Sequence, residues 1–148
     1  MRFMMFMIPA VYQPDTPPDK RAGEGFAPIA EAVAAMTKYN EELAKAGVLV
    51  SLDGLHPLLD GARVSFHGGK PVVIDGHSVK AKEVVGGYWI IEVKSKEEAI
   101  EWAKRCPASD DDVIEGRQIQ ELSEFPEEVR EAAKSPTVQA EIERHIRQ

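Results

Sequence analysis

The residues best suited to chemistry lie in a short polar stretch between two apolar runs. This stretch, DGHSVKAKE, is the densest group of titratable side chains in the chain, with Asp75, His77, Lys80, Lys82 and Glu83. Carboxylates and imidazoles are the groups that most often exchange protons with a bound substrate. We therefore take Asp75, His77 and Glu83 as candidate catalytic residues for acid–base chemistry.

Each of these residues also has a structural explanation. Asp75-Gly76 is typical of a turn, because Asp accepts backbone hydrogen bonds and Gly takes positive φ. If His77 approaches Asp75, the carboxylate orients the ring and raises its pKa; the alternative is a solvent-exposed His77 without a role. Lys82 and Glu83 are adjacent, so on a strand one faces a pocket and the other faces away; the alternative is a solvated pair.

Four further residues are candidate ligand-binding groups. His56 precedes Pro57, which favours an extended backbone there and places His56 at a pocket rim. Lys82 joins it from the polar stretch. Tyr88 and Trp89 point to opposite sides of a strand, so one enters the core and the other is free to line a cavity on the sheet face.

Composition limits the class of protein. The 148 residues fit one domain, and 43% hydrophobic with 29% charged residues is ordinary for a globular chain. A net charge of −7 argues against a nucleic-acid partner, which needs a positive face. The apolar run at the N-terminus stops at Pro9, too short for a membrane span, and predicts a buried strand instead.

Cysteine and metal chemistry receive little support. Cys106 is the single cysteine, which excludes an intrachain disulfide and favours a reducing cytoplasm. Asp75, His77 and His56 offer three metal-ligating groups, but no closely spaced signature accompanies them. We expect neither a metal nor another cofactor.

The pattern of elements predicts an α+β fold with a mainly antiparallel sheet and two helices on one face. The predicted strands cover residues 3–8, 48–52, 62–67, 72–74, 88–93 and 113–122, and the predicted helices cover 28–46 and 96–105. A split βαβ, ferredoxin-like arrangement fits this order best. Two helices cover only one sheet face, so we expect a homodimer in which the sheet faces of two copies meet.

Two segments lie outside this pattern. The Pro- and Gly-rich loop of residues 12–25 is either a lid or a solvated insertion. Residues 123–148 form a helical extension of the domain at 1–122, with Val138, Ile142 and Ile146 at helical spacing. This tail packs on its own domain or on a partner.

Three stretches carry a resemblance to a known family: EELAKAGVLVSLDGLHP, VVIDGHSVKAKEVVGGYWIIEVKSKEEAIEWAKRCP and IEGRQI. In their order and spacing the chain resembles the YCII-related, or DGPF-domain, family from about Phe3 to Glu121. The resemblance implies a dimeric α+β barrel of ferredoxin-like subunits and a bacterial protein, some relatives being encoded near extracytoplasmic-function sigma factors. It implies no settled activity.

Two departures from the family pattern bear on function. The DGPF motif reads Asp75-Gly76-His77-Ser78 here. The family's His–Asp pair is also absent from its usual places: residues 26–29, at the start of the first helix, contain no histidine, and the Asp-Pro after the second helix is replaced by Cys106-Pro107. The chain is thus expected to be a dimeric binder of an unknown small molecule, with or without acid–base catalysis. The alternatives are a protein-interaction or regulatory module and a scaffold without chemistry.

Overall fold

The computed structural model describes residues 1–79 and 81–147, so Lys80 of the polar stretch lies outside the described residues. The elements in chain order are β1 (Arg2–Ile8), α1 (Ala30–Lys45), β2 (Leu49–Gly54), β3 (Ala62–His67), β4 (Lys70–Asp75), β5 (Gly87–Glu92), α2 (Lys96–Lys104), β6 (Val113–Gln118), α3 (Glu127–Ala132) and α4 (Pro136–Ile146). Short 3₁₀ turns η1 (Ala10–Tyr12), η2 (Pro18–Lys20), η3 (Leu58–Asp60), η4 (Gly76–Ser78) and η5 (Leu122–Glu124) connect them.

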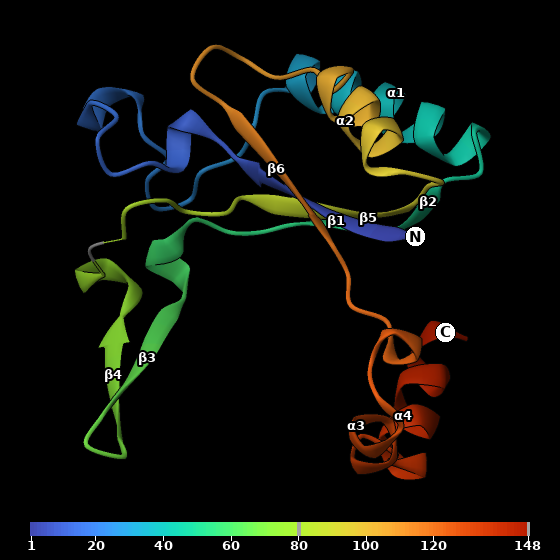
Figure 1. Cartoon of the computed structure of the whole chain (residues 1–148). Helices are drawn as coiled ribbons and strands as arrows, with labels where there is room; N and C mark the ends of the chain where they lie inside the picture. The colour runs from blue at the N-terminus through green and yellow to red at the C-terminus, as the bar shows by residue number, and fades with distance from the viewer. Residues whose placement is uncertain (80, 148) are drawn as a thin grey trace.

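The main sheet has the strand order β2-β5-β1-β6, and its neighbouring strands are antiparallel. With α1 after β1 and α2 after β5, this is the split βαβ order that the sequence predicts. Both helices lie on the same face of the sheet (Figure 1). The predicted α+β class is confirmed.

The hairpin β3–β4 corrects one prediction. Residues 72–74 were expected to share a sheet with residues 88–93, but β4 pairs only with β3, in a separate two-stranded sheet. The Gly68-Gly69 turn, with φ of 56° and 77°, closes β3 directly onto β4. The hairpin is therefore an insertion between β2 and β5, and it projects from the sheet side opposite the helices (Figure 1).

The core lies between the main sheet and the two helices. Alternate residues of β1 and β5 enter it, and they meet one face of each helix. The buried cluster comprises Phe3, Met5, Tyr39, Leu43, Val48, Trp89, Ile91, Val93, Ala99, Trp102 and Cys106. The Tyr39 hydroxyl donates to the Trp102 carbonyl at 2.7 Å, which ties α1 to α2.

Only part of the apolar side of α1 reaches this core. Tyr39 and Leu43 are buried and Met36 is half-buried, whereas Ile29 and Val33 are exposed. The first turns of α1 therefore extend beyond the packed layer, and they border an open space. In α2, Ile100 is likewise exposed, whereas Ala99 and Trp102 are buried.

Candidate binding cleft

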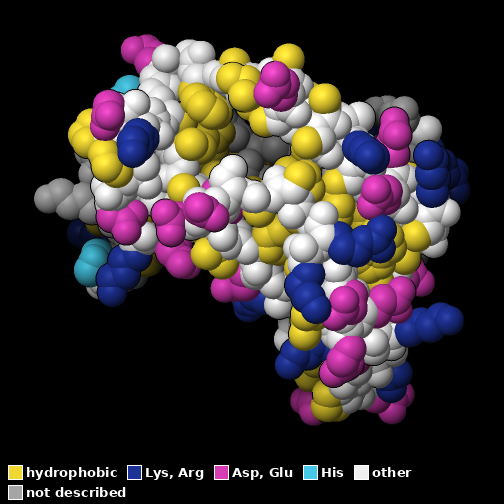
Figure 2. Space-filling model, turned by 90° about the horizontal axis from the view of Figure 1, so that it is seen from above, with side chains coloured by type: hydrophobic (Ala, Val, Ile, Leu, Met, Phe, Trp, Pro, Cys, Tyr) yellow, Lys and Arg dark blue, Asp and Glu magenta, His cyan; other side chains and the backbone are white. Residues whose placement is uncertain are grey.

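A cleft of about 1540 Å³ lies at the end of the main sheet, where the first turns of α1 extend past the core. Five chain segments line it: the end of β1 with the loop after it, the residues around the start of α1, the segment after β2, the stretch 82–86 and the turn before β6. Seen from the helix side, the surface is hollowed between hydrophobic side chains, with acidic side chains near the margin (Figure 2).

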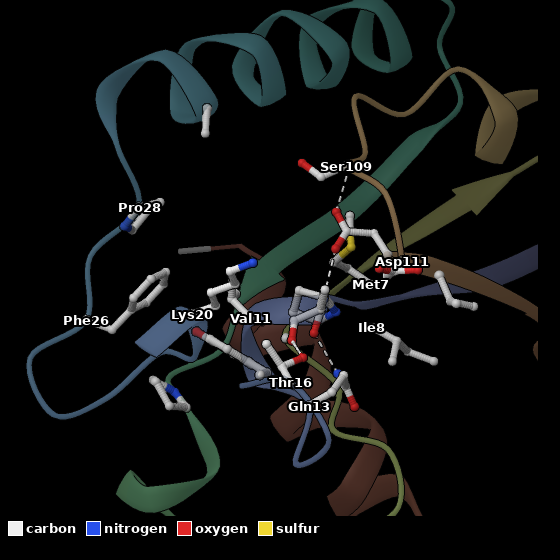
Figure 3. A pocket seen from close by; sticks show the side chains of 18 of the residues that line it. Met7, Ile8, Val11, Gln13, Thr16, Lys20, Phe26, Pro28, Ser109 and Asp111 are labelled. Atoms are coloured by element: carbon white, nitrogen blue, oxygen red, sulfur yellow. Dashed lines mark hydrogen bonds between the residues drawn. The ribbon is translucent and has the colours of Figure 1, made fainter. Parts of the chain in front are cut away.

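The walls of the cleft are largely apolar. Phe26 and Pro28 come from the segment before α1, and Ser109 and Asp111 from the segment before β6, with Val11 and Lys20 between them (Figure 3). One face of α1 adds Ala32, Ala35 and Met36. Ile29 is exposed because it lines the cleft and does not enter the core.

Gln13 holds two walls of the cleft together. Its side-chain amide donates to the carbonyls of Pro9 and Val84 at 2.7 and 2.9 Å, and its Oε1 accepts from the Val84 N–H at 2.9 Å. Gln13 is also buried, although it is a polar residue in a loop. It fixes the backbone beside Glu83 against the loop after β1, and nothing in the sequence pattern singled it out.

A second set of bonds fastens the same loop. The Tyr12 hydroxyl donates to the Leu55 carbonyl at 2.7 Å, and burial raises the pKa of Tyr12. The Gly86 N–H donates to the Met7 carbonyl at 2.8 Å, and a Cβ on Gly86 would lie 2.6 Å from Pro9 Cγ. The loop of residues 12–25 thus starts from an anchored wall of the cleft.

The acidic turn before β6 is fixed by its own side chain. Asp112 accepts from the Ala10 N–H through Oδ1 and from the Ser109 N–H through Oδ2, both at 2.8 Å. Asp111 takes the left-handed backbone conformation, with φ of 70°. Asp112 therefore shapes the cleft wall, while Asp110 and Asp111 contribute charge to the lining.

Three of the predicted site residues line the cleft: His56, Lys82 and Glu83. His56 Nδ1 lies 3.5 Å from Asp60 Oδ2, an ion-pair distance when the ring is protonated. Lys82 and Glu83 were expected on opposite faces of a strand, but their segment is irregular and both residues line the cleft. Asp60 was not among the predicted site residues, although the sequence places it four residues after His56.

Asp75 and His77 lie outside the cleft lining, so the structure does not bring them together with Glu83. Both are exposed, and Asp75 Oδ1 accepts from the His77 N–H at 3.0 Å as the cap of η4. Between them, Gly76 packs on η3: a Cβ there would lie 1.9 Å from the Leu58 carbonyl oxygen. Close approach, and not positive φ, explains this glycine.

Tyr88 and Trp89 point to opposite sides of β5, as predicted, and neither lines the cleft. Trp89 is in the core, where its Nε1 donates to Asn40 Oδ1 at 2.8 Å and its ring meets Tyr39 edge-on. Tyr88 lies half-exposed on the open sheet face. Its hydroxyl donates to Asp53 Oδ2 at 2.7 Å, and this hydrogen bond raises the pKa of Tyr88.

The charged groups of the cleft include residues that sequence reasoning missed. Asp15 and Lys20 line it, together with Lys82, Glu83 and the acidic turn. Among residues 1–79 and 81–147, no ion pair involves Lys20 or Lys82. Within the same residues, no three His, Cys, Asp or Glu side chains are grouped to hold a metal ion.

No helix in the described part of the chain has the length and apolarity to cross a bilayer.

Comparison with known proteins agrees with the resemblance seen in the sequence. The family model described as "YCII-related domain" matches residues 4–123, which cover the main sheet except for the first two residues of β1, both of its helices, the hairpin and every segment of the cleft. A search of the curated proteins gives no match. The helices α3 and α4 lie beyond the matched residues. The chain belongs to the YCII-related family.

Proposed function

We propose that this chain binds a small organic molecule in the cleft at the end of the main sheet. The observation that carries the proposal is an apolar-walled cleft with lysines and carboxylates on its lining, which is how ligand sites are commonly built. The walls are fastened by Gln13 and Tyr12, so the site is preformed. The best-suited ligand has an apolar body and a polar end that reaches Lys20 or Lys82.

Two groups of the cleft are able to move a proton. Glu83 and His56 are both lining residues of the cleft, and His56 Nδ1 lies 3.5 Å from Asp60 Oδ2. This pair supports acid–base chemistry without a cofactor. Asp75 and His77 lie outside the lining, so the proposal places any proton transfer on Glu83 and His56.

We also propose that the working form is a homodimer with opposed sheet faces. The sheet face away from the helices carries a half-buried strip of Met4, Phe6, Tyr88 and Ile90, with no element of the described chain packed over it. The total accessible area is 11015 Å². A compact monomer of 16.4 kDa exposes about 7,500 Å², so roughly 3,500 Å² is left to cover.

A second candidate function is a protein-interaction or regulatory module. The observation in its favour is the apolar stripe of α4, where Val138, Ile142 and Ile146 are all exposed. This function places the tail on a third protein and leaves the cleft without a ligand. It therefore makes the opposite prediction for a small-molecule screen.

The test is a thermal-shift screen of a small-molecule library with two matched variants on α1. Ala35 lines the cleft and its neighbour Ala34 does not, although both are exposed. We expect hits that stabilise the wild type and Ala34→Trp but not Ala35→Trp, because an indole at position 35 occupies the part of the cleft beside α1. A library without such a hit, or hits that ignore Ala35→Trp, would overturn the proposal.

A further inference from the structure

The hairpin β3–β4 presents an unpartnered apolar face. Its register pairs Val64 with Val73 and Phe66 with Pro71, so these side chains share one face. Phe66 is 72% exposed and Val73 is 70% exposed. An isolated two-stranded hairpin is marginally stable in water. Because only its base is packed, through η3 and η4, this face needs a cover.

The C-terminal tail presents a second unpartnered face. Val138, Ile142 and Ile146 follow one another at every fourth residue of α4 and are 57%, 55% and 77% exposed. Among the described residues, no hydrogen bond or ion pair joins α3 or α4 to the domain. The end of the domain from which the tail continues is held by an ion pair. Arg2 binds both carboxylate oxygens of Glu121, at 2.7 and 3.1 Å.

These two arms lie on the same side of the main sheet, at opposite ends of it (Figure 1). Two copies whose sheet faces meet are related by a two-fold axis that lies between the sheets. If this axis is perpendicular to the line from hairpin to tail, it places the hairpin end of one sheet opposite the tail end of the other. The hairpin of one copy then lies beside the tail of the other. This contact occurs twice and closes the pair, as a symmetric dimer requires.

Charge favours this pairing over hairpin with hairpin and tail with tail. The hairpin, residues 62–75, carries Arg63 and Lys70 against Asp75, a net charge of +1, and the two basic side chains point away from the apolar face. Residues 123–147 of the tail carry six acids against four lysines and arginines, a net charge of −2. Unlike arms therefore bring opposite net charges together, whereas like arms bring equal ones together.

We propose that each tail packs its Val138–Ile142–Ile146 stripe on the Val64–Phe66–Val73 face of the hairpin of a second copy of this chain. The inference rests on the dimer of the proposed function and adds the reciprocal contact of unlike arms. The uncovered area of roughly 3,500 Å² per chain leaves ample surface for an extensive interface, of the size that obligate dimers bury. One occupant covers the sheet face, the hairpin and the tail together.

The test uses the full chain with single new cysteines at exposed positions, Val73→Cys on the hairpin and Val138→Cys on the tail. The two variants are co-expressed with different affinity tags and treated with a short bismaleimide. Cys106, the native thiol, is buried, and burial raises its pKa to about 11, so the wild type serves as an unreactive control. The molecular mass in solution is measured on the same samples.

We expect a dimer in which Val73→Cys links to Val138→Cys and neither links to itself. Linkage of like with like would overturn the reciprocal pairing in favour of hairpin–hairpin and tail–tail contacts. A dimer without any linkage would overturn the arm contact and leave the sheet-face dimer standing. A monomer would overturn both, while the thermal-shift screen tests the cleft independently of either.

A matched pair of substitutions tests the energetics. Phe66→Asp places a charge on the apolar face, and His67→Asp places the same charge on the next residue, whose side chain points the opposite way. We expect Phe66→Asp to raise the dimer dissociation constant at least about tenfold. Equal effects of the two substitutions, or no effect of either, would overturn the contact.

Discussion

Replacing Gln13 by alanine should free the loop after β1 from the segment around Val84 and so destabilise the whole domain. The side chain makes three hydrogen bonds to backbone groups of two segments that are far apart in the chain. At about 1 kcal/mol for each bond, Gln13→Ala should lower the free energy of unfolding by about 3 kcal/mol. That is a large share of the 5–15 kcal/mol that typically stabilises a domain.

Urea unfolding, followed by circular dichroism at one protein concentration, measures this loss. Hydrogen exchange locates it, because the Val84 N–H loses its acceptor on Gln13 and should exchange faster. A Gln13→Ala chain as stable as the wild type, with unchanged exchange at Val84, would refute the reasoning. The exchange of the Trp89 amide, in the core strand β5, is the internal control.

Gln13→Glu provides a matched control with a pH signature. The new carboxylate still accepts the hydrogen bond from the Val84 N–H through one oxygen. Its other oxygen faces the carbonyl oxygens of Pro9 and Val84, to which the Gln13 amide donates in the wild type. Repulsion and burial raise its pKa in the folded state above the ordinary value near 4.3. The variant should therefore approach wild-type stability below the unfolded-state pKa and lose it as pH rises through the folded-state pKa. A pH-independent difference from the wild type would contradict the bonding scheme.

Three further predictions follow from local geometry. Gly76→Ala should cost at least about 2 kcal/mol in urea unfolding, because its Cβ would lie 1.9 Å from a carbonyl oxygen, whereas Gly23→Ala in open space should be near neutral; equal costs would contradict the packing. The Cys106 thiol should react with Ellman's reagent at pH 8 only on unfolding, since burial raises its pKa to about 11; rapid labelling of folded protein would contradict this. The hydrogen bond from Arg2 lowers the pKa of Glu121, so the stabilisation that this pair gives should be complete above the ordinary Glu pKa and be lost as pH falls through the lowered pKa. Urea unfolding of Glu121→Gln measures it: the variant should be less stable than the wild type at pH 7 and lose less at pH 3. An equal difference at the two pH values would contradict this.

The fold was readable from the sequence because its signals are local and repeated. A continuous apolar run predicts the strand at residues 3–8, and apolar residues at helical spacing predict the helix at 28–46; both are found, as β1 (Arg2–Ile8) and α1 (Ala30–Lys45). The separation of β4 from β5 was not readable, because periodicity gives the existence of a strand and not its partner. The exposure of Ile29 was not readable either, because apolar residues at helical spacing do not show where the packed layer ends.

The candidate site was only partly readable. Glu83 and His56 stood out by residue type, and both line the cleft. Asp75 and His77 stood out equally, but the close packing of Gly76 on η3 holds them at the base of the hairpin. Gln13 gave no signal, because its importance comes from bonds to a segment 71 residues away in the chain.

The central claim is that the cleft, and not the open sheet face or the arms, takes small molecules. The most direct measurement is a titration of the isotope-labelled chain with 8-anilinonaphthalene-1-sulfonate, an apolar probe with an anionic end, followed through backbone amide chemical shifts. The account predicts shifts concentrated at Val11, Ala35 and Gly86, which line the cleft, and their loss in Ala35→Trp. Shifts confined to Phe66 of the hairpin or Ile142 of the tail, with the cleft amides unmoved, would contradict it.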